Sequence, residues 1–391
     1  MIEDFLKYQA KTTPSPMGIE IANASGNYLY DVDGKSYLDF VAGVSACPLG
    51  HSHPKIIKAI QDQTNKYMHV MVYGEFAQAP AVKLCKKLVQ LLPENQEVVY
   101  LTNSGTEAIE GALKLAKRVT QRSGLIAAYQ SYHGSTHGAL SLLGNEKQKK
   151  AYRPLLPGVN FIAFNKESDL KKINEKTAAV LLETIQGGAG FIEPKNNYLK
   201  KVKEKCNEEG ALLILDEIQP GFGRTGKMFG FENYGISPDI VVMGKALGGG
   251  LPIGAFSASS SLMKKLEANP KLGHITTFGG NPVIAASAFA TLKEIEDSGI
   301  INKISNKEKL FRKHLVNPKI KRIQGTGLML APIFENDRIP NYLVPQCIKK
   351  GLLLFWLLWE KNAIRISPPL TISEEEIILG CKIICETLEE F

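Results

Sequence analysis

The sequence contains no apolar run long enough to cross a membrane. Its most apolar stretch, residues 352–359, is far shorter than the ~20 residues that a spanning helix needs. We interpret this stretch as a core strand. The first 16 residues lack the apolar segment of a secretory signal. These two absences predict a cytoplasmic protein with no membrane partner.

Cysteine is scarce, with six in 391 residues, and no two of them form a Cys-x-x-Cys pair. A disulfide framework and a zinc-type site are therefore not expected, and free thiols in a reducing compartment are. His51 and His53 could share a metal ion only on a strand, and no third ligand is evident. Turn residues before a helix starting near Pro54 are the favoured interpretation, and we expect no metal.

Charge is not concentrated in any segment. The formal net charge is +8, and the lysines are spread along the chain, which predicts a solvated surface and no nucleic-acid partner. No Gly-x-Gly-x-x-Gly follows an early strand, so an NAD-binding protein is excluded. No internal repeat or low-complexity tract is present.

What the chain does have is a pair of continuous apolar runs that end on polar residues. Residues 211–215 lead into Asp216 and Glu217, and residues 240–243 lead to Lys245. Such runs predict strands buried on both faces of an α/β sheet. Ligands of open α/β sheets bind at the C-terminal ends of the strands, and glycines follow both runs here. An acid and an amine are therefore expected at one binding edge.

A lysine amine with a lowered pKa forms Schiff bases, and pyridoxal phosphate needs such a lysine together with an acid opposite its ring nitrogen. Lys245 and Asp216 fit these two roles. Taken singly, each has an ordinary explanation as a turn aspartate or a surface lysine. Because they follow neighbouring buried strands, we favour the functional interpretation for the pair.

A second candidate site follows residues 98–101, a predicted strand. The sequence continues through Ser104, Gly105 and Thr106 into a helical pattern. A strand, a small polar turn and a helix form an anion site, because backbone N–H groups and the helix dipole face the anion. These three residues are our candidate phosphate ligands. An ordinary N-cap at Ser104 or Thr106 is the alternative, and the two can coexist.

The remaining pattern predicts the domains. Strands and helices alternate over residues 109–290, which favours a mainly parallel sheet. Asp33-Gly34 sits in an alternating stretch and predicts a hairpin with a type I′ turn. After residue 283 a long helix to about 297 and then shorter segments follow. We expect a large domain at 51–282, and a small α+β domain made of 1–50 and 283–391.

Two motifs carry a specific resemblance. LDEIQPGFGRTG, residues 215–226, and GKALGGGLPIGA, residues 244–255, resemble the class III (subgroup II) pyridoxal-phosphate aminotransferases. That family includes acetylornithine, ornithine and 4-aminobutyrate aminotransferases. The likeness extends from about Gly26 to Pro369. It implies fold type I: a large domain with a mainly parallel seven-stranded sheet, and a smaller α+β domain.

The resemblance also implies roles for individual residues. Tyr132 matches the aromatic that stacks on the cofactor ring, Gln219 the amide on its phenolic oxygen, and Thr277 the threonine that reaches the neighbouring subunit's cofactor. A homodimer with shared active sites follows. Arg365 matches the arginine that binds the substrate carboxylate; without the resemblance, an ion-paired edge-strand arginine would be favoured. The further implied residues are, for the cofactor, His133, Glu183 and Ile218 and, for the substrate, Ser135 and Thr276.

The implied activity is transamination. An amino group would move between an amino acid or ω-amino compound and an oxo acid through a Lys245 Schiff base, with freed Lys245 as the base. An aminomutase or decarboxylase on the same scaffold would need no oxo acid, and it remains an alternative. A catalytically silent dimer is a further one, but it would have no physical need to keep Lys245, Asp216, Gln219 and Thr277 together.

Two departures from the family concern the substrate. Many members have an arginine for a second carboxylate where Ser135 stands, and a glutamate that pairs with the substrate arginine where Gly188 stands. Without both, Arg365 would stay open to a carboxylate. This argues against acetylornithine, ornithine and 4-aminobutyrate as donors and against 2-oxoglutarate as acceptor. Val44 in place of the ornithine enzymes' tyrosine argues further against ornithine. Another cation, such as Arg153, could restore an acetylornithine-type enzyme.

Overall fold

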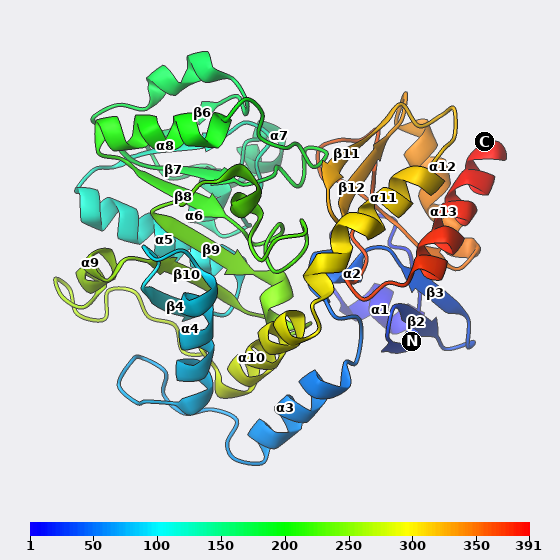
Figure 1. Ribbon diagram of the computed structural model, residues 1–391, viewed down its shortest axis with the longest axis horizontal. Helices are drawn as coiled ribbons and strands as arrows, with labels where there is room; N and C mark the ends of the chain where they lie inside the picture. The colour runs from blue at the N-terminus through cyan, green and yellow to red at the C-terminus, as the bar shows by residue number, and fades with distance from the viewer.

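A seven-stranded sheet forms the core of the larger part of the protein, on the left in Figure 1. The computed structural model describes residues 1–391. Strand β10 is antiparallel to both of its neighbours, and the other six strands run in one direction. The expected mainly parallel seven-stranded sheet of an α/β fold is therefore confirmed. In spatial order the strands are β4 (Val98–Thr102), β10 (Gly254–Ala258), β9 (Ile240–Gly244), β8 (Leu212–Asp216), β7 (Thr177–Glu183), β5 (Gly124–Ala128) and β6 (Val159–Ile162).

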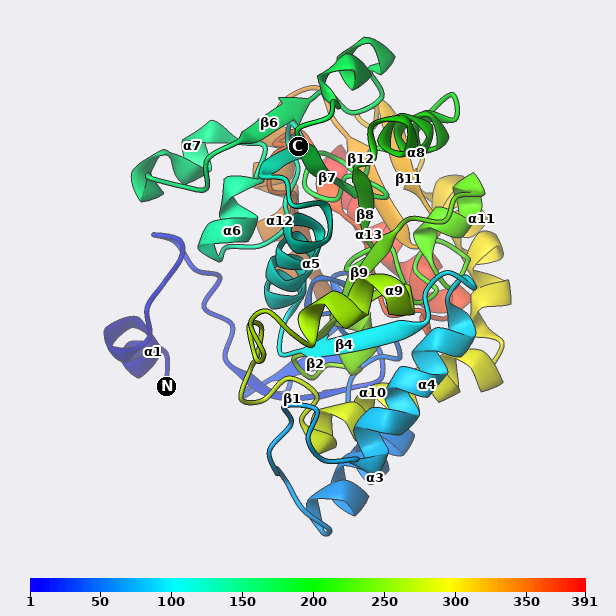
Figure 2. The same cartoon turned by 90° about the vertical axis from the view of Figure 1, so that its left-hand side faces the viewer.

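Both faces of this sheet are covered. In β8, Leu213 and Leu215 pack into one hydrophobic cluster, whereas Ile214 packs into another. This alternation is the two-residue period of a strand, and it explains why the strands read as continuous apolar runs. Figure 2 shows the helices around the sheet. Those associated with it are α3 (Pro54–Thr64), α4 (Ala79–Leu91), α5 (Gly105–Thr120), α6 (His137–Ser141), α7 (Glu146–Lys149), α8 (Tyr198–Glu209), α9 (Ser260–Met263) and α10 (Pro282–Asp297).

A second group of elements combines both ends of the chain. A four-stranded sheet has the order β1 (Ile21–Ser25), β2 (Tyr28–Asp31), β3 (Ser36–Asp39) and β13 (Leu352–Leu353), so strands more than 300 residues apart lie side by side. Two further hairpins are β11 (Arg322–Thr326) with β12 (Met329–Ile333) and β14 (Phe355–Trp356) with β15 (Ile364–Arg365). The helices of this part are α2 (Ala42–Ser45), α11 (Ile304–His314), α12 (Arg338–Lys349) and α13 (Glu374–Glu389).

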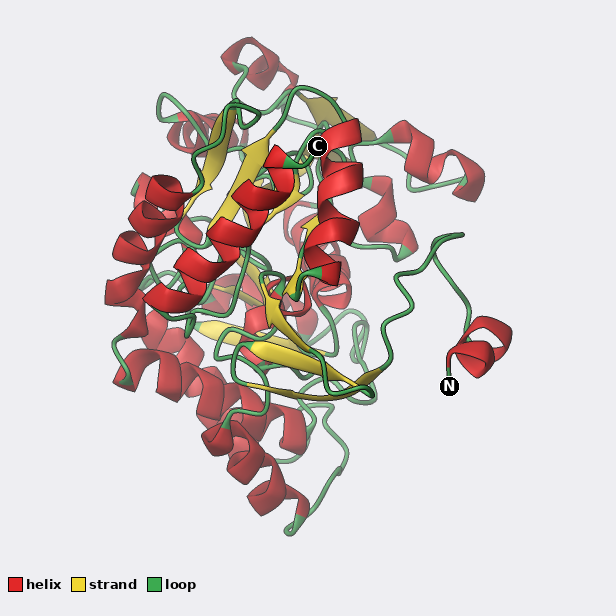
Figure 3. Ribbon diagram, turned by 90° about the vertical axis from the view of Figure 1, so that its right-hand side faces the viewer, coloured by secondary structure: helices red, strands yellow, loops and turns green.

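The chain begins with α1 (Ile2–Tyr8), which has no buried residue. Figure 3 shows this helix standing apart from the rest of the chain, at the N mark. No helix anywhere combines the length and apolarity needed to span a membrane.

Two local predictions were wrong. Residues 352–359 do not form one core strand: Leu352 pairs with β3, Phe355 pairs with Arg365, and Leu358 is 48% exposed. The chain changes sheet partner within a few residues, which apolarity alone does not reveal. The hairpin near Asp33-Gly34 exists, but Gly34 is its only residue with positive φ, and the Gly34 N–H bonds to Asp31 O at 3.1 Å. A type I′ turn requires positive φ at both central residues, so the turn is of another type.

The N-terminal segment is attached through Phe40, which follows β3. Its ring is fully buried, lies edge-on to Phe311 of α11 at 5.3 Å between centroids, and packs against Gly380 of α13. One aromatic side chain therefore joins the first sheet to the two helices of the chain's C-terminal part.

Replacing this ring should be costly. Phe40→Ala is expected to lower the free energy of unfolding by about 3–5 kcal/mol, because the cavity can collapse only in part. Phe391→Ala, which truncates a ring that is 47% exposed, serves as the matched control and should change stability little. Urea unfolding followed by circular dichroism measures both. Equal effects of the two variants would contradict the assigned packing.

Candidate active site

Polar side chains meet where β7, β8 and β9 end. Glu183 and Asp216 are register partners at the ends of two parallel strands, and Asp216 also pairs with Val242 of β9. Lys245 follows the last residue of β9. Because parallel strands present their C-terminal ends at one edge, this register alone brings two acids and an amine together.

Asp216 is buried and holds a histidine. Its Oδ2 lies 2.8 Å from Nδ1 of His133, and its Oδ1 accepts a hydrogen bond from the Ile218 N–H at 3.0 Å. The Nε2 atom of His133 is buried without a partner. These contacts fix the Asp216 carboxylate and orient the His133 imidazole. The Nε2 atom of that imidazole remains without a hydrogen-bond partner.

Glu217, the next residue, has a structural role that its position beside Asp216 in the sequence does not predict. Its carboxylate accepts hydrogen bonds from Thr184 Oγ1 at 2.5 Å and from the N–H groups of Gly230 and Phe231 at 2.6 and 2.9 Å. Burial raises its pKa to about 7 despite these donors. Glu217 therefore fixes the loop around residue 230. The sequence offered no signal for this contact beyond an unassigned carboxylate.

Glu183 joins two neighbouring segments. It accepts hydrogen bonds from the backbone N–H of Tyr132 at 3.2 Å and of Gly187 at 2.9 Å. Burial raises its pKa to about 7, and the nearby Asp216 charge adds to the increase. The turn after β5 and the loop after β7 are thereby held at fixed positions beside Asp216.

Lys245 is strained and its amine is free. Its φ is +44°, in a region that non-glycine residues rarely adopt and that costs about 1–3 kcal/mol. The side chain has neither a hydrogen-bond nor an ion-pair partner. Desolvation lowers its pKa, Asp216 raises it, and Arg365 lowers it. Desolvation dominates, so the amine is more readily neutral, and hence nucleophilic, than that of a surface lysine.

The start of α5 presents backbone N–H groups that make no hydrogen bond. The backbone N–H groups of Gly105 and Thr106 have no acceptor, while Ser104 Oγ caps the helix by accepting from the Glu107 N–H at 3.3 Å. A side chain on residue 105 would come within 2.7 Å of Ile218, so only glycine allows this close packing. The predicted N-cap is present, and the unbonded N–H groups beside it leave the predicted anion site open.

The remaining candidates surround this centre. Tyr132 is partly buried, and its hydroxyl lies 3.2 Å from Oγ of the exposed Ser135. Gln219 donates to Ser45 Oγ at 3.4 Å, a contact that the sequence did not suggest. Ser45 belongs to α2, where Ala42, Gly43, Val44 and Ser45 all have positive φ. Four consecutive left-handed residues form a strained turn opposite the glutamine.

Arg365 is 4% exposed and has no carboxylate partner. Its Nε atom is buried without an acceptor, and desolvation lowers the guanidinium pKa to about 10. A buried, unpaired cation is costly, so an external anion would be strongly favoured here. The ion-paired edge-strand arginine considered as its alternative does not occur.

The other sequence candidates lie in different surroundings. Thr277 is exposed and Thr276 lines an outer groove, so the chain does not bring them to its own Lys245. His51 binds Asp39 at 2.8 Å, which raises its pKa to about 10, and His53 precedes α3. Arg153 forms a two-pronged ion pair with Glu146, at 2.9 Å for each contact. No group of three metal-binding side chains is assembled.

Comparison with known proteins identifies the family to which this chain belongs. The family described as aminotransferase class-III matches residues 8–388, nearly the whole chain. The chain belongs to this family. The aminotransferase is 40% identical to the acetylornithine aminotransferase of Clostridium acetobutylicum over 90% of this chain and 92% of that protein. It is 38% identical to the putrescine aminotransferase of Pectobacterium atrosepticum over 95% of this chain and 83% of that one.

Solved structures of related enzymes have the same fold. The ornithine aminotransferase of Toxoplasma gondii superposes with a TM-score of 0.92 at 29% identity, covering 100% of this chain and 94% of that chain; its structure is described with partial occupancy of PLP at the active site. The cofactor of the class III aminotransferase described here is pyridoxal phosphate. The residues present fit it: the free amine of Lys245 suits an aldehyde, and the unbonded N–H groups of Gly105 and Thr106 suit a phosphate.

The lowered pKa of Lys245 can be tested in the cofactor-free enzyme. Its amine should react with acetic anhydride with a pH midpoint below the ~10.4 of an ordinary lysine, because burial disfavours the charged form. Competitive labelling followed by peptide mass spectrometry measures the midpoint, with the exposed lysines of the same sample as the internal reference. A midpoint equal to that of the exposed lysines would refute the desolvated environment.

Proposed function

We propose that this class III aminotransferase transfers an amino group from an amino acid or ω-amino compound to an oxo acid, with Lys245 as its catalytic lysine. The observation that carries the proposal is the unpartnered amine of Lys245 beside the register-matched acids Asp216 and Glu183, with the unpaired guanidinium of Arg365 among its charged neighbours. Amine, acid and anion-binding cation are the three groups that transamination requires.

The cofactor would be held by residues from several strand ends. Ser104, Gly105 and Thr106 would bind its phosphate, and Lys245 would bind its aldehyde carbon. Asp216, steadied by His133, would accept a hydrogen bond from the ring nitrogen and keep that nitrogen protonated. The ring would be bordered by Tyr132 and Ile218, with Gln219 at its phenolic oxygen and Glu183 fixing the Tyr132 backbone.

Pyridoxal phosphate supplies the electron sink that stabilises negative charge on the substrate carbon. The chain supplies the proton transfer: once the substrate amine displaces it, Nζ of Lys245 takes the proton from the carbon that carries the amine. Its lowered pKa favours the neutral form, which can accept this proton. Arg365 would orient the substrate by its carboxylate, with Ser135 on the substrate side. Thr276 lines the outer groove, so it would contribute to the site of a partner subunit.

One alternative has specific support, and a second stays open. Several relatives are named acetylornithine aminotransferase, which favours an acetylornithine-type enzyme that uses 2-oxoglutarate. Against it stand Ser135 and Gly188, and the most obvious replacement cation, Arg153, is already paired with Glu146. An aminomutase would use the same Lys245 and Asp216 but would turn over without an oxo acid.

A half-reaction separates these possibilities. The enzyme is converted to its amino form with a panel of amines and then challenged separately with pyruvate and 2-oxoglutarate, following the cofactor absorbance. Rapid return with pyruvate alone is expected, since Ser135 stands where the family has its second-carboxylate arginine and Arg153 is paired with Glu146. Rapid return with 2-oxoglutarate would instead support the acetylornithine type, and return with neither would favour an aminomutase.

Two variants control this measurement. Lys245→Ala should lack the Schiff-base absorption band of the purified enzyme, and persistence of that Schiff-base band would disprove the lysine assignment. Arg365→Ala should raise the KM for pyruvate, because the carboxylate loses its guanidinium partner. An unchanged KM would place carboxylate recognition elsewhere.

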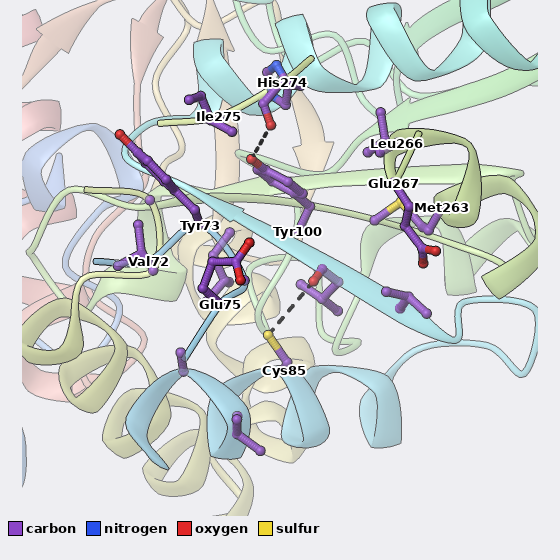
Figure 4. A pocket seen from close by; sticks show the side chains of 18 of the residues that line it. Val72, Tyr73, Glu75, Cys85, Tyr100, Met263, Leu266, Glu267, His274 and Ile275 are labelled. Atoms are coloured by element: carbon purple, nitrogen blue, oxygen red, sulfur yellow. Dashed lines mark hydrogen bonds between the residues drawn. The ribbon is translucent and has the colours of Figure 1, made fainter. Parts of the chain in front are cut away.

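The proposal includes a homodimer with shared active sites. Its support is an apolar groove of about 1260 Å³ along β4, bordered by residues 72–101 and 260–280. In Figure 4, Tyr73 and Ile275 lie toward one end of the groove and Met263 and Leu266 toward the other, with Tyr100 between them. Phe76 is 59% exposed and Phe278 55%. Exposed aromatic side chains beside a groove are typical of protein–protein interfaces.

A second copy of the chain is the proposed occupant. Thr276 lines the groove and Thr277 is exposed next to it, away from their own Lys245. A partner docked here could receive Thr277 at its cofactor phosphate, as the family resemblance implies.

Charge placed in the groove should break the dimer. Phe76→Glu is expected to shift sedimentation from dimer to monomer and to weaken cofactor retention. Val316→Glu, at an apolar residue that is 73% exposed outside the groove, is the matched control and should remain dimeric. A Phe76→Glu protein that stays fully dimeric would move the interface elsewhere.

We further propose the domain division into 51–282 and 1–50 with 283–391. The seven-stranded sheet lies within residues 98–258, while β1, β2 and β3 share a sheet with β13. Helix α10 begins at the proposed boundary and packs against α3 and α4 of the large part, so it connects the two parts. A cytoplasmic location is proposed from the six free cysteines.

A further inference from the structure

Arg365 shares a short hairpin with a tryptophan. Strands β14 and β15 pair Phe355 with Arg365, and the connecting loop contains Trp359. That loop folds onto the segment after β7: the N–H groups of Trp359 and Glu360 both donate to the carbonyl of Gly188, at 2.9 and 3.3 Å. The position of Trp359 is therefore set by backbone hydrogen bonds at both ends of the hairpin.

The indole of Trp359 fills the space in which a side chain on residue 188 would lie. A Cβ added to Gly188 would come within 2.8 Å of Nε1 and 2.9 Å of Cδ1 of the indole, and within 3.3 Å of Leu358. Nε1 is buried and has no acceptor. Any side chain at position 188, including a carboxylate that could neutralise Arg365, would have to displace this ring.

A continuous chain of contacts connects the indole to the active site. Glu183 binds the backbone N–H groups of both Tyr132 and Gly187. Gly187 packs against the side-chain oxygen of Gln219 and directly precedes Gly188. The rings of Tyr132 and Trp359 lie 6.5 Å apart at 54°, an edge-tilted aromatic pair. Trp359 and Tyr132 thus form adjoining aromatic parts of one wall.

This wall is uncharged. The Ser135 hydroxyl is engaged with that of Tyr132, and neither Trp359 nor Tyr132 can neutralise a carboxylate. A second substrate carboxylate placed here would lose its hydration without gaining a cation, which is unfavourable. An apolar tail would gain from burial against the two rings.

We propose that Trp359 determines the substrate class: it keeps Arg365 free for a single carboxylate and packs against an uncharged, apolar substrate tail. The inference rests on the proposed function and narrows it to monocarboxylate substrates with neutral tails. Trp359 is a specificity-determining residue that touches the substrate, not a participant in proton transfer.

Kinetics with three oxo acids test this role. In the half-reaction with pyruvate, 4-methyl-2-oxopentanoate and 2-oxoglutarate, Trp359→Ala should raise the KM for the branched acid ~10-fold or more and that for pyruvate less than ~3-fold, with kcat nearly unchanged. Trp359→Phe should restore most of the loss, because a ring remains. The proposal is overturned if Trp359→Ala changes the KM for all three acids equally, or for none.

Two further measurements do not depend on turnover. Trp356 and Trp359 are the only tryptophans, so in Trp356→Phe the fluorescence reports Trp359 alone. Titration of that holoenzyme with 4-methylpentanoate should change the emission, and no change at saturating concentrations would contradict contact with the tail. Gly188→Ala should lower the thermal midpoint in the wild type but much less in Trp359→Ala, and an equal loss in both would disprove the packing.

These outcomes also distinguish failure of the proposed transamination from failure of the proposed role of Trp359. If no oxo acid restores the absorbance of the wild-type enzyme, the proposed transamination fails, whatever the fluorescence shows. If transamination proceeds but the Trp359 variants keep the same preference among the acids, only the specificity role fails.

Discussion

The parallel register of β7, β8 and β9 is the constraint on which the site depends. It sets Glu183 beside Asp216 and brings Lys245 to the same edge, so that three ionisable groups from distant parts of the sequence become neighbours. Side-chain alternation then separates adjacent functions: Asp216 meets His133, whereas Glu217 turns away to hold the loop at residue 230. A one-residue slip of β8 would exchange these two carboxylates.

Burial shifts the pKa values of the ionisable groups in this site. The acids Glu183 and Glu217 have pKa values raised to about 7, and desolvation lowers the pKa values of Lys245 and Arg365. Each shift disfavours the charged form, as expected where water is excluded. Between pH ~4.3 and 7 the folded chain holds protons on the two acids that the unfolded chain releases, so their contribution to stability falls as pH rises through that range. An anionic cofactor and a carboxylate substrate would offset the buried cations.

Much of the fold and of the candidate site could be predicted from the sequence, because the patterns that indicate them lie within short stretches of the chain. The apolar runs at 211–215 and 240–243 became β8 and β9, and the turn at Ser104 became the start of α5. What could not be predicted depends on partners distant in the chain. The stretch 352–359 divides between two sheets, and the indole of Trp359 lies in the side-chain space of Gly188. No periodicity or composition encodes such contacts.

We propose above that the strand-end cluster at Lys245 holds the cofactor. Reduction of the purified holoenzyme with borohydride, followed by digestion and mass spectrometry, tests it most directly, because reduction fixes the cofactor to the lysine that carries it. The account predicts the added pyridoxyl phosphate mass on the peptide containing Lys245. The same mass on a different lysine, or on none, would contradict it.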